Sequence, residues 1–224
     1  MSPLCYLCGL AVTADRSADH VPPKQVYARA IRAAINLSNL VTLPAHSACN
    51  GAYSLDEEYF VQTLAPIADS ETSRPIVADF AARVRAGEKV PLAFRMLAQF
   101  TKDLSGLVLP RGLIALRVEG ARLKRVIWKI VRGLHFIETG DVLPEGTVFC
   151  VELVEPENRD PSDLDELWEA VKAQQPKGKY GAIFEYKHAH LSAETVGLHA
   201  WGMLLWNSVM IFVAYPDPST AAQP

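Results

Sequence analysis

The sequence lacks a surplus of charge of either sign. Its 224 residues include 22 Lys and Arg and 25 Asp and Glu, which gives a formal net charge of -3 at pH 7. Any binding of nucleic acid must therefore come from a local patch of basic side chains. With 50% hydrophobic and 21% charged residues, the composition excludes a disordered or fibrous chain and indicates a globular protein with a substantial core.

Cysteine is scarce too, since the chain has only four. The N-terminus, MSPLCYLCGLAVTADRS, lacks the basic start and the apolar run of a secretory signal, so we expect a cytoplasmic protein without a disulfide framework. Three of the cysteines, Cys5, Cys8 and Cys49, lie in the first quarter of the chain. The fourth, Cys150, lies in the apolar run TVFCVELV, where we expect a buried core thiol.

Hydrophobic runs of membrane-spanning length are absent, with one candidate exception, VGLHAWGMLLWNSVMIFVAY at residues 196–215. Its length approaches the roughly 20 apolar residues of a membrane span. However, His199 lies inside the run, Asn207 and Ser208 interrupt it, and the tail PDPSTAAQP has no Lys or Arg. We therefore expect two β-strands joined at Asn207-Ser208 and no association with a membrane.

The remaining patterns predict an α+β fold in three parts. Residues 1–53 form a small metal-stapled module, residues 54–104 a helical connecting region, and residues 105–224 a domain with a mainly antiparallel sheet. Helices are predicted at 54–67, 73–87, 91–104, 121–140 and 161–174, and strands at 112–120, 147–154, 180–191 and in the final hairpin. The third part has an unknown role, and substrate binding, formation of a homodimer and contact with a partner protein all fit it.

Four residues of the first part have the spacing of a zinc site. Cys5 and Cys8 form a C-x2-C pair, and His46 and Cys49 form an H-x2-C pair. Four sulfur and nitrogen ligands make the closed tetrahedral set that structural zinc prefers. Incidental thiols and a surface histidine are the alternative, but the second pair favours zinc. The ion would then supply much of the folding free energy of so small a module.

Between the two pairs lies the stretch ADHVPPK, in which Asp19 precedes His20. The Asp19 carboxylate offers a hard oxygen ligand for Mg²⁺ or Mn²⁺, and His20 points to the opposite side of an extended strand. Hydrolysis of a phosphodiester needs a water, a base that takes its proton and a cation that stabilises charge on the phosphate. Two adjacent residues can therefore hold a metal and activate a water without competing for one position.

Three features together resemble the HNH endonuclease family and its ββα-metal site: Asp19-His20, an Asn before the apolar segment LVTL, and Cys49-Asn50 in the second pair. The layout is most similar to the members with paired Cys knuckles, and the resemblance covers residues 5–53. It implies a hydrolase that cleaves DNA, with a structural zinc separate from the catalytic ion. His46 departs from the pattern, because Cys is more usual there, but His is also a good zinc ligand.

The resemblance also implies a role for each matching residue. His20 would be the general base, and Asp19 and Asn50 would be ligands of a catalytic Mg²⁺ or Mn²⁺. Asn39 would be the middle Asn that holds the loop of His20 in shape. Asn36 is a rival for that role, although Asn39 directly precedes the predicted strand.

Two groups of basic residues are candidates for contact with the phosphates of DNA. Lys24, Arg29 and Arg32 follow His20 closely in sequence. The segment ARLKRVIWKIVRG has five basic and no acidic residues, and its candidates are Lys124, Arg125 and Lys129. A solvated helix face that covers a sheet explains this second group equally well.

His188 and His190 alternate on a predicted strand and so share a face, which invites comparison with a metal site. No carboxylate or cysteine is spaced to complete such a site, so we expect exposed or sheet-packed residues. The sequence as a whole predicts a metal-dependent endonuclease. The alternative from another class is a catalytically silent zinc module that binds nucleic acid or a protein.

Overall fold

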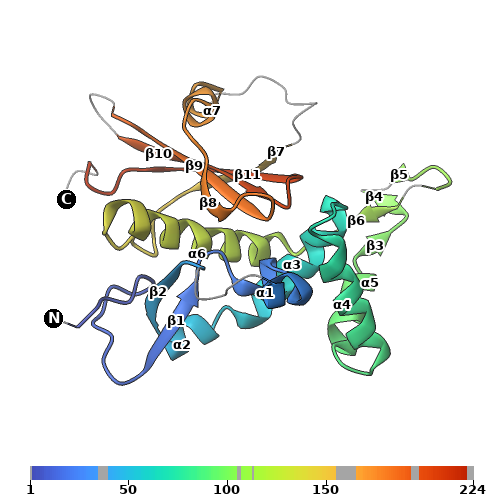
Figure 1. The fold of residues 1–224 in the computed structure, drawn as a ribbon. Helices are drawn as coiled ribbons and strands as arrows, with labels where there is room; N and C mark the ends of the chain where they lie inside the picture. Colours follow the sequence, from blue (N-terminus) through green and yellow to red (C-terminus); the bar gives the residue numbers. More distant parts are fainter. Residues whose placement is uncertain are drawn as a thin grey trace.

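A five-stranded antiparallel sheet, in the order β7-β11-β10-β9-β8, dominates the C-terminal part of the chain in the computed structural model (Figure 1). The structure describes residues 2–34, 40–104, 107–112, 114–154, 165–192 and 197–220. The strands of the sheet are β7 (Cys150–Val154), β8 (Lys177–Tyr180), β9 (Phe184–Leu191), β10 (Leu198–Leu205) and β11 (Val209–Pro216).

Strands β10 and β11 form the hairpin that the sequence predicts at Asn207-Ser208. The pairing runs from Leu198 opposite Pro216 to Leu205 opposite Val209. The turn places Trp206 and Asn207 at positive φ, as the twist of a tight hairpin requires. Among the described residues, no helix is long and apolar enough to cross a membrane.

Each face of the sheet is covered by one helix (Figure 1). Helix α6 (Gly120–Thr139) lies on one face, where Trp128 meets Tyr215 of β11 edge-on with ring centroids 5.4 Å apart. Helix α7 (Asp165–Lys172) lies on the other face, where Leu167 and Val171 belong to a small apolar cluster with Phe212. Both faces of the sheet therefore carry buried apolar residues.

A ββα unit lies against α6 on the side away from the sheet (Figure 1). Strand β1 (Arg16–His20) pairs antiparallel with β2 (Thr42–His46), with Asp19 opposite Leu43, and α2 (Ser47–Gly51) begins at the next residue. Helix α3 (Ser54–Ala68) follows after two residues, so the chain is nearly continuously helical from Ser47 to Ala68. This unit carries most of the predicted site residues.

The remaining elements are short. A 3-10 turn, η1, precedes α1, and two small ladders, β3 with β6 and β4 with β5, follow α5. Their bounds are η1 (Lys24–Val26), α1 (Arg29–Ala34), α4 (Arg74–Arg85), α5 (Val90–Leu97), β3 (Phe100–Thr101), β4 (Asp103–Leu104), β5 (Leu107–Val108) and β6 (Ala115–Leu116).

The mixed helix and sheet composition confirms the predicted α+β class, but three local predictions are wrong. The helix expected over 91–104 ends at Leu97, because Phe100–Thr101 pairs with Ala115–Leu116. The strand expected over 112–120 is represented among the described residues by β6 alone, which has two residues. Cys150 is exposed rather than buried, since β7 is an edge strand. Residues 161–164 of the expected acidic helix lie outside the described part of the chain.

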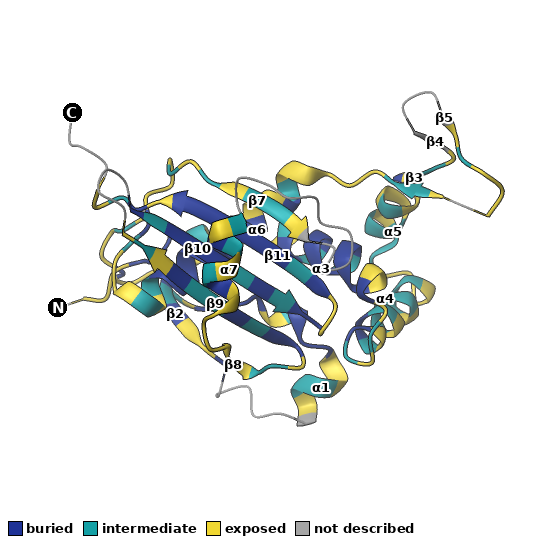
Figure 2. Ribbon diagram, turned by 90° about the horizontal axis from the view of Figure 1, so that it is seen from above, coloured by how far each residue is buried: buried dark blue, intermediate teal, exposed yellow. Residues whose placement is uncertain are grey.

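The main core crosses both boundaries that the sequence suggested. One cluster of buried hydrophobic residues runs from Cys5 and Tyr6 through Tyr59 to Trp201 and Tyr215. Figure 2 shows the buried positions along β10 and β11 at the centre of the sheet. Helix α6 contributes to this core on two sides, and it is the element that joins the ββα unit to the sheet.

Candidate functional site

The four predicted zinc ligands lie together, and we call them the Cys/His cluster: Cys5, Cys8, His46 and Cys49. One ligand atom from each falls within 4.8 Å of all the others. The His46 Nδ1 atom lies 3.3 Å from Cys8 Sγ and 3.9 Å from Cys49 Sγ. A tetrahedral zinc with bonds of about 2.0 Å to nitrogen and 2.3 Å to sulfur requires nitrogen–sulfur separations of about 3.5 Å. The four side chains therefore fit a zinc ion.

The backbone around these ligands prepares the His46 ring for binding. His46 Nε2 lies 3.2 Å from the Ala11 carbonyl, which can only accept, so Nε2 carries the proton and Nδ1 is left free toward the sulfur atoms. Gly9 follows the C-x2-C pair at a φ of 74°, a conformation that favours glycine. Burial alone would raise the pKa of Cys5, but hydrogen bonds from the backbone amides of His46 and Cys8 help lower it to about 7.

A single tyrosine connects this cluster to Asp19. Tyr6, which lies between the two N-terminal cysteines, donates a hydrogen bond from its hydroxyl to Asp19 Oδ2 at 2.6 Å. Burial, together with the negative charge of Asp19, raises the pKa of Tyr6 well above its ordinary value, so the hydroxyl remains a donor. Asp19 itself is 4% exposed.

Asp19 and Asn50, the two predicted ligands of a catalytic cation, converge on one point, and the Lys129 ammonium occupies it. Lys129 Nζ lies 2.8 Å from Asp19 Oδ2 and 3.0 Å from Asn50 Oδ1. It also contacts a Glu57 carboxylate oxygen. Lys129 comes from α6 and is only 1% exposed. We call Asp19, Asn50 and Glu57 the oxygen cluster.

The oxygen cluster fits a hard cation. Two carboxylates and an amide carbonyl are the donors that Mg²⁺ and Mn²⁺ prefer. The ammonium stands in for such an ion, although it neutralises only one of the two formal negative charges of Asp19 and Glu57. The orientation of Asn50 is fixed from the other side, because its Nδ2 donates to Ser17 Oγ at 3.0 Å. A divalent ion can enter this set only after Lys129 has left it.

His20 lies on β1 directly after Asp19, and its side chain therefore points away from the oxygen cluster. The ring is partly buried. Burial lowers the pKa of His20, and the positive charges of Lys24, Lys129 and Arg32 lower it further. A neutral imidazole at pH 7 is able to accept a proton.

A cavity of about 460 Å³ lies beside Lys24 and helix α1. The Nε atom of Arg32 is buried without a hydrogen-bond partner in the described part of the structure, and burial lowers the pKa of that guanidinium. An unpaired buried donor of positive charge suits an anion. The charged residues that line the cavity are Lys24, Arg29, Arg32, Arg83 and Lys89, with Glu58 and Asp79 opposing them.

The basic residues of α6 lie differently from a phosphate-binding stripe. Lys129 is buried in the oxygen cluster, and its place leaves it no access to a phosphate. Arg125 pairs with Asp56 at 2.5 Å and stacks over Tyr53, while Lys124 is exposed. Of the three candidates, only Lys129 is buried, whereas Lys124 and Arg125 are exposed. Lys129 anchors α6 to the ββα unit.

Sequence reasoning missed Tyr6, Glu57 and the true place of Lys129. Glu57 had a detectable signal, since it lies seven positions after Asn50 in a nearly continuous helical run and so shares its face. Asn39 and its rival Asn36 lie outside the described residues.

Comparison of the chain with protein-family models, with curated proteins and with solved structures finds no match.

Proposed function

We propose that the protein is a metal-dependent endonuclease of the HNH type that hydrolyses phosphodiester bonds in DNA. The observation that carries the proposal is the convergence of Asp19 and Asn50 on one cation position beside a four-ligand zinc set. These ligands are on β1 and on the helix that follows β2, which is the layout that a ββα-metal site requires. The basic cavity beside Lys24 offers a place for a phosphate.

In this mechanism His20 takes a proton from the attacking water. Asp19 and Asn50 would hold a catalytic Mg²⁺ or Mn²⁺, and Glu57 would be an additional oxygen ligand. When bound, the ion stabilises negative charge on the phosphate and on the leaving oxygen. Lys24, Arg29 and Arg32 position the DNA backbone, and zinc at the Cys/His cluster takes no part in the chemistry.

The position of Lys129 favours a second candidate function, a catalytically silent module that binds nucleic acid or protein. A lysine that stays permanently among the carboxylates stabilises the fold and leaves no room for a divalent ion. Under the first proposal Lys129 moves away when the ion binds. The two functions therefore differ in one measurable property, the ability of the oxygen cluster to take up Mg²⁺ or Mn²⁺.

Cleavage of supercoiled plasmid with Mg²⁺ or Mn²⁺ tests the first proposal. Replacing His20 by Ala should lower the rate by about 10²- to 10⁴-fold, the contribution typical of a general base. The variant should keep its zinc and its thermal unfolding temperature, because His20 belongs to neither metal set. Equal nicking by both proteins rejects His20 as the base.

The substrate panel should also include linear, branched and single-stranded DNA and RNA. If the wild-type protein cleaves none of them with either ion, the endonuclease proposal fails and the silent module is favoured. Binding of the same substrates without cleavage, measured by fluorescence anisotropy, would then support the second function directly.

A further inference from the structure

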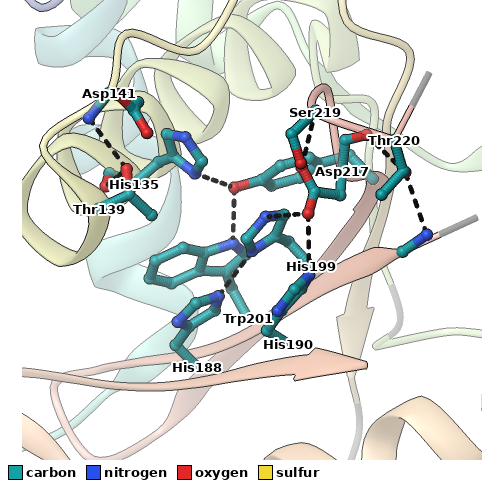
Figure 3. A network of polar contacts seen from close by, with 12 residues as sticks. His135, Thr139, Asp141, His188, His190, His199, Trp201, Asp217, Ser219 and Thr220 are labelled. Atoms are coloured by element: carbon teal, nitrogen blue, oxygen red, sulfur yellow. Dashed lines mark hydrogen bonds and ion pairs between the residues drawn. The ribbon is translucent and has the colours of Figure 1, made fainter. Parts of the chain in front are cut away.

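A second group of possible metal ligands lies on the C-terminal sheet, next to His135 of α6, whose ring centroid is 5.2 Å from that of His199 (Figure 3). His190 on β9 and His199 on β10 are directly opposite each other in the pairing of the two strands. Asp217 follows the last residue of β11 and turns toward both rings. One ligand atom from each of the three residues lies within 4.8 Å of the other two.

The separations match those of a metal site. Asp217 Oδ2 lies 2.9 Å from His190 Nε2 and 3.8 Å from His199 Nε2. A tetrahedral ion with bonds of about 2.0 Å to nitrogen and oxygen needs ligand separations of about 3.3 Å, between these two values. A simple ion pair between His190 and Asp217 explains the shorter distance but not the approach of the His199 ring to the same oxygen.

Neighbouring residues hold the ligands in orientation. His199 Nδ1 lies 2.9 Å from His188 Nε2, so a protonated Nδ1 can donate a hydrogen bond to His188 and leave His199 Nε2 free to bind a metal. Ser219 donates to Asp217 Oδ1 from its backbone amide at 2.8 Å and from its hydroxyl at 2.7 Å. Oδ1 is thus engaged, and Oδ2 is the oxygen that faces the two rings (Figure 3).

The three ligand atoms have room for an ion and can be reached from the solvent. Gly197 lies beside the cluster, and a Cβ atom at this position would lie 3.3 Å from both Asp217 Oδ2 and His190 Nε2. A side chain there would crowd the two ligand atoms. The side chains of His199 and Asp217 are 6% and 12% exposed, whereas that of His190 is 44% exposed. An ion can therefore enter from the solvent past His190.

We propose that His190, His199 and Asp217 form a binding site for a divalent transition-metal ion of the zinc class. Two imidazoles and one carboxylate suit Zn²⁺, Co²⁺ or Ni²⁺ better than Mg²⁺ or Ca²⁺, which prefer oxygen ligands. Three protein ligands leave a coordination position open to water or to a small ligand, unlike the closed Cys/His cluster. The site does not depend on the endonuclease proposal.

The number of ions per chain tests this site. The full-length protein, loaded with Zn²⁺ and freed of excess metal, should hold one more zinc than the variant His190→Ala, as measured by mass spectrometry. Asp217→Asn should lose the same ion. Loss of a ligand should weaken binding by more than the 10- to 100-fold that is typical for loss of an outer-shell partner. Lys187→Ala, on the same strand, is the matched control and should keep the wild-type number.

Co²⁺ distinguishes this site from the cysteine cluster, because only the cysteine cluster gives intense thiolate-to-metal absorption. Titration of the wild-type protein should show one strongly and one weakly absorbing binding event. His190→Ala should remove the weakly absorbing event alone, and its unchanged thiolate absorption shows that the variant is folded. The proposal is overturned if the wild-type protein shows no second event, or if both ligand variants retain it.

Discussion

The Cys/His cluster and the oxygen cluster lie side by side in the ββα unit, yet they differ in where their cation comes from. The first set consists of three thiols and an imidazole, so any cation that it binds has to come from solution. The second receives the Lys129 ammonium from α6. Removal of metal ions with a chelator should leave the oxygen cluster intact, because its cation belongs to the chain. The same treatment should disrupt the Cys/His cluster. Each of the following changes tests this difference.

The largest effect is expected for Cys49→Ala. Zinc binding at a structural site is worth about 10 to 16 kcal/mol in isolated zinc-binding peptides, which equals or exceeds the total stability of most domains. Loss of one thiolate should therefore release zinc and unfold the ββα unit. Metal analysis and thermal unfolding followed by circular dichroism would show both changes.

Under the endonuclease proposal, cleavage of DNA should disappear with it, because Asn50 is the next residue. Cys150→Ala is the matched control, since this cysteine is exposed and far along the chain. It should retain the zinc and the unfolding temperature of the wild-type protein. A Cys49→Ala protein with wild-type stability would show that the cluster does not bind zinc.

Lys129→Met should have the second-largest effect. The change leaves Asp19 and Glu57 buried without their cation, and removal of one partner from a buried ion pair costs about 3 to 5 kcal/mol. Under the endonuclease proposal Mn²⁺ should replace the ammonium, so added Mn²⁺ should raise the unfolding temperature of the variant more than that of the wild-type protein. Differential scanning fluorimetry with and without the ion measures this shift.

Lys124→Met on the same helix is the control, and as an exposed substitution it should change stability by less than about 0.5 kcal/mol. If Mn²⁺ fails to stabilise Lys129→Met, the oxygen cluster is no divalent-ion site and the silent module is the better proposal. Faster cleavage by the variant than by the wild-type protein would instead identify Lys129 as a block that the ion has to displace.

The same comparison explains what the sequence could predict. The Cys/His cluster is encoded locally, because each two-residue spacer fixes a pair of ligands on one turn and only the meeting of the two pairs depends on the fold. Asp19 and Asn50 were predictable only through a resemblance in the order of residues. Their convergence depends on the register of β1 with β2, which places Asp19 opposite Leu43.

Lys129 and Asp217 were beyond prediction for a different reason. Lys129 is 79 positions from Asn50, on a helix whose buried face was predictable but whose partner was not. Its charge suggested an exposed residue. Burial of the ammonium is favourable only because it pairs with the buried carboxylates of Asp19 and Glu57. Asp217 similarly meets His190 only because three strands align side by side, and no spacing in the sequence records that alignment.

A smaller effect is expected for Tyr6→Phe, which removes the hydrogen bond from Tyr6 to Asp19 that links the two clusters. The zinc ligands stay intact, so the zinc content should not change. Loss of a buried hydrogen bond to a charged acceptor should destabilise the protein by about 1 to 3 kcal/mol. Tyr180→Phe, outside both clusters, is the control for chemical denaturation. If Tyr6→Phe also released zinc, the two clusters would be one cooperative unit rather than two.

The smallest effect on stability is expected for Arg125→Ala, because ion pairs near the surface contribute at most about 1 kcal/mol and the Arg125 side chain is 47% exposed.

The effect of Arg125→Ala on DNA binding should be compared with that of Arg32→Ala. Each lost phosphate contact should reduce the slope of log binding constant against log salt by about 0.9 for duplex DNA. Arg32 lines the basic cavity, and under the endonuclease proposal it contacts a phosphate there, so its replacement should reduce the slope by one such step. Arg125 is engaged by Asp56 and Tyr53, so its replacement should leave the slope unchanged. The opposite result would mean that DNA binds along α6 and pulls Arg125 from Asp56, and that the basic face of this helix serves the substrate as well as the fold.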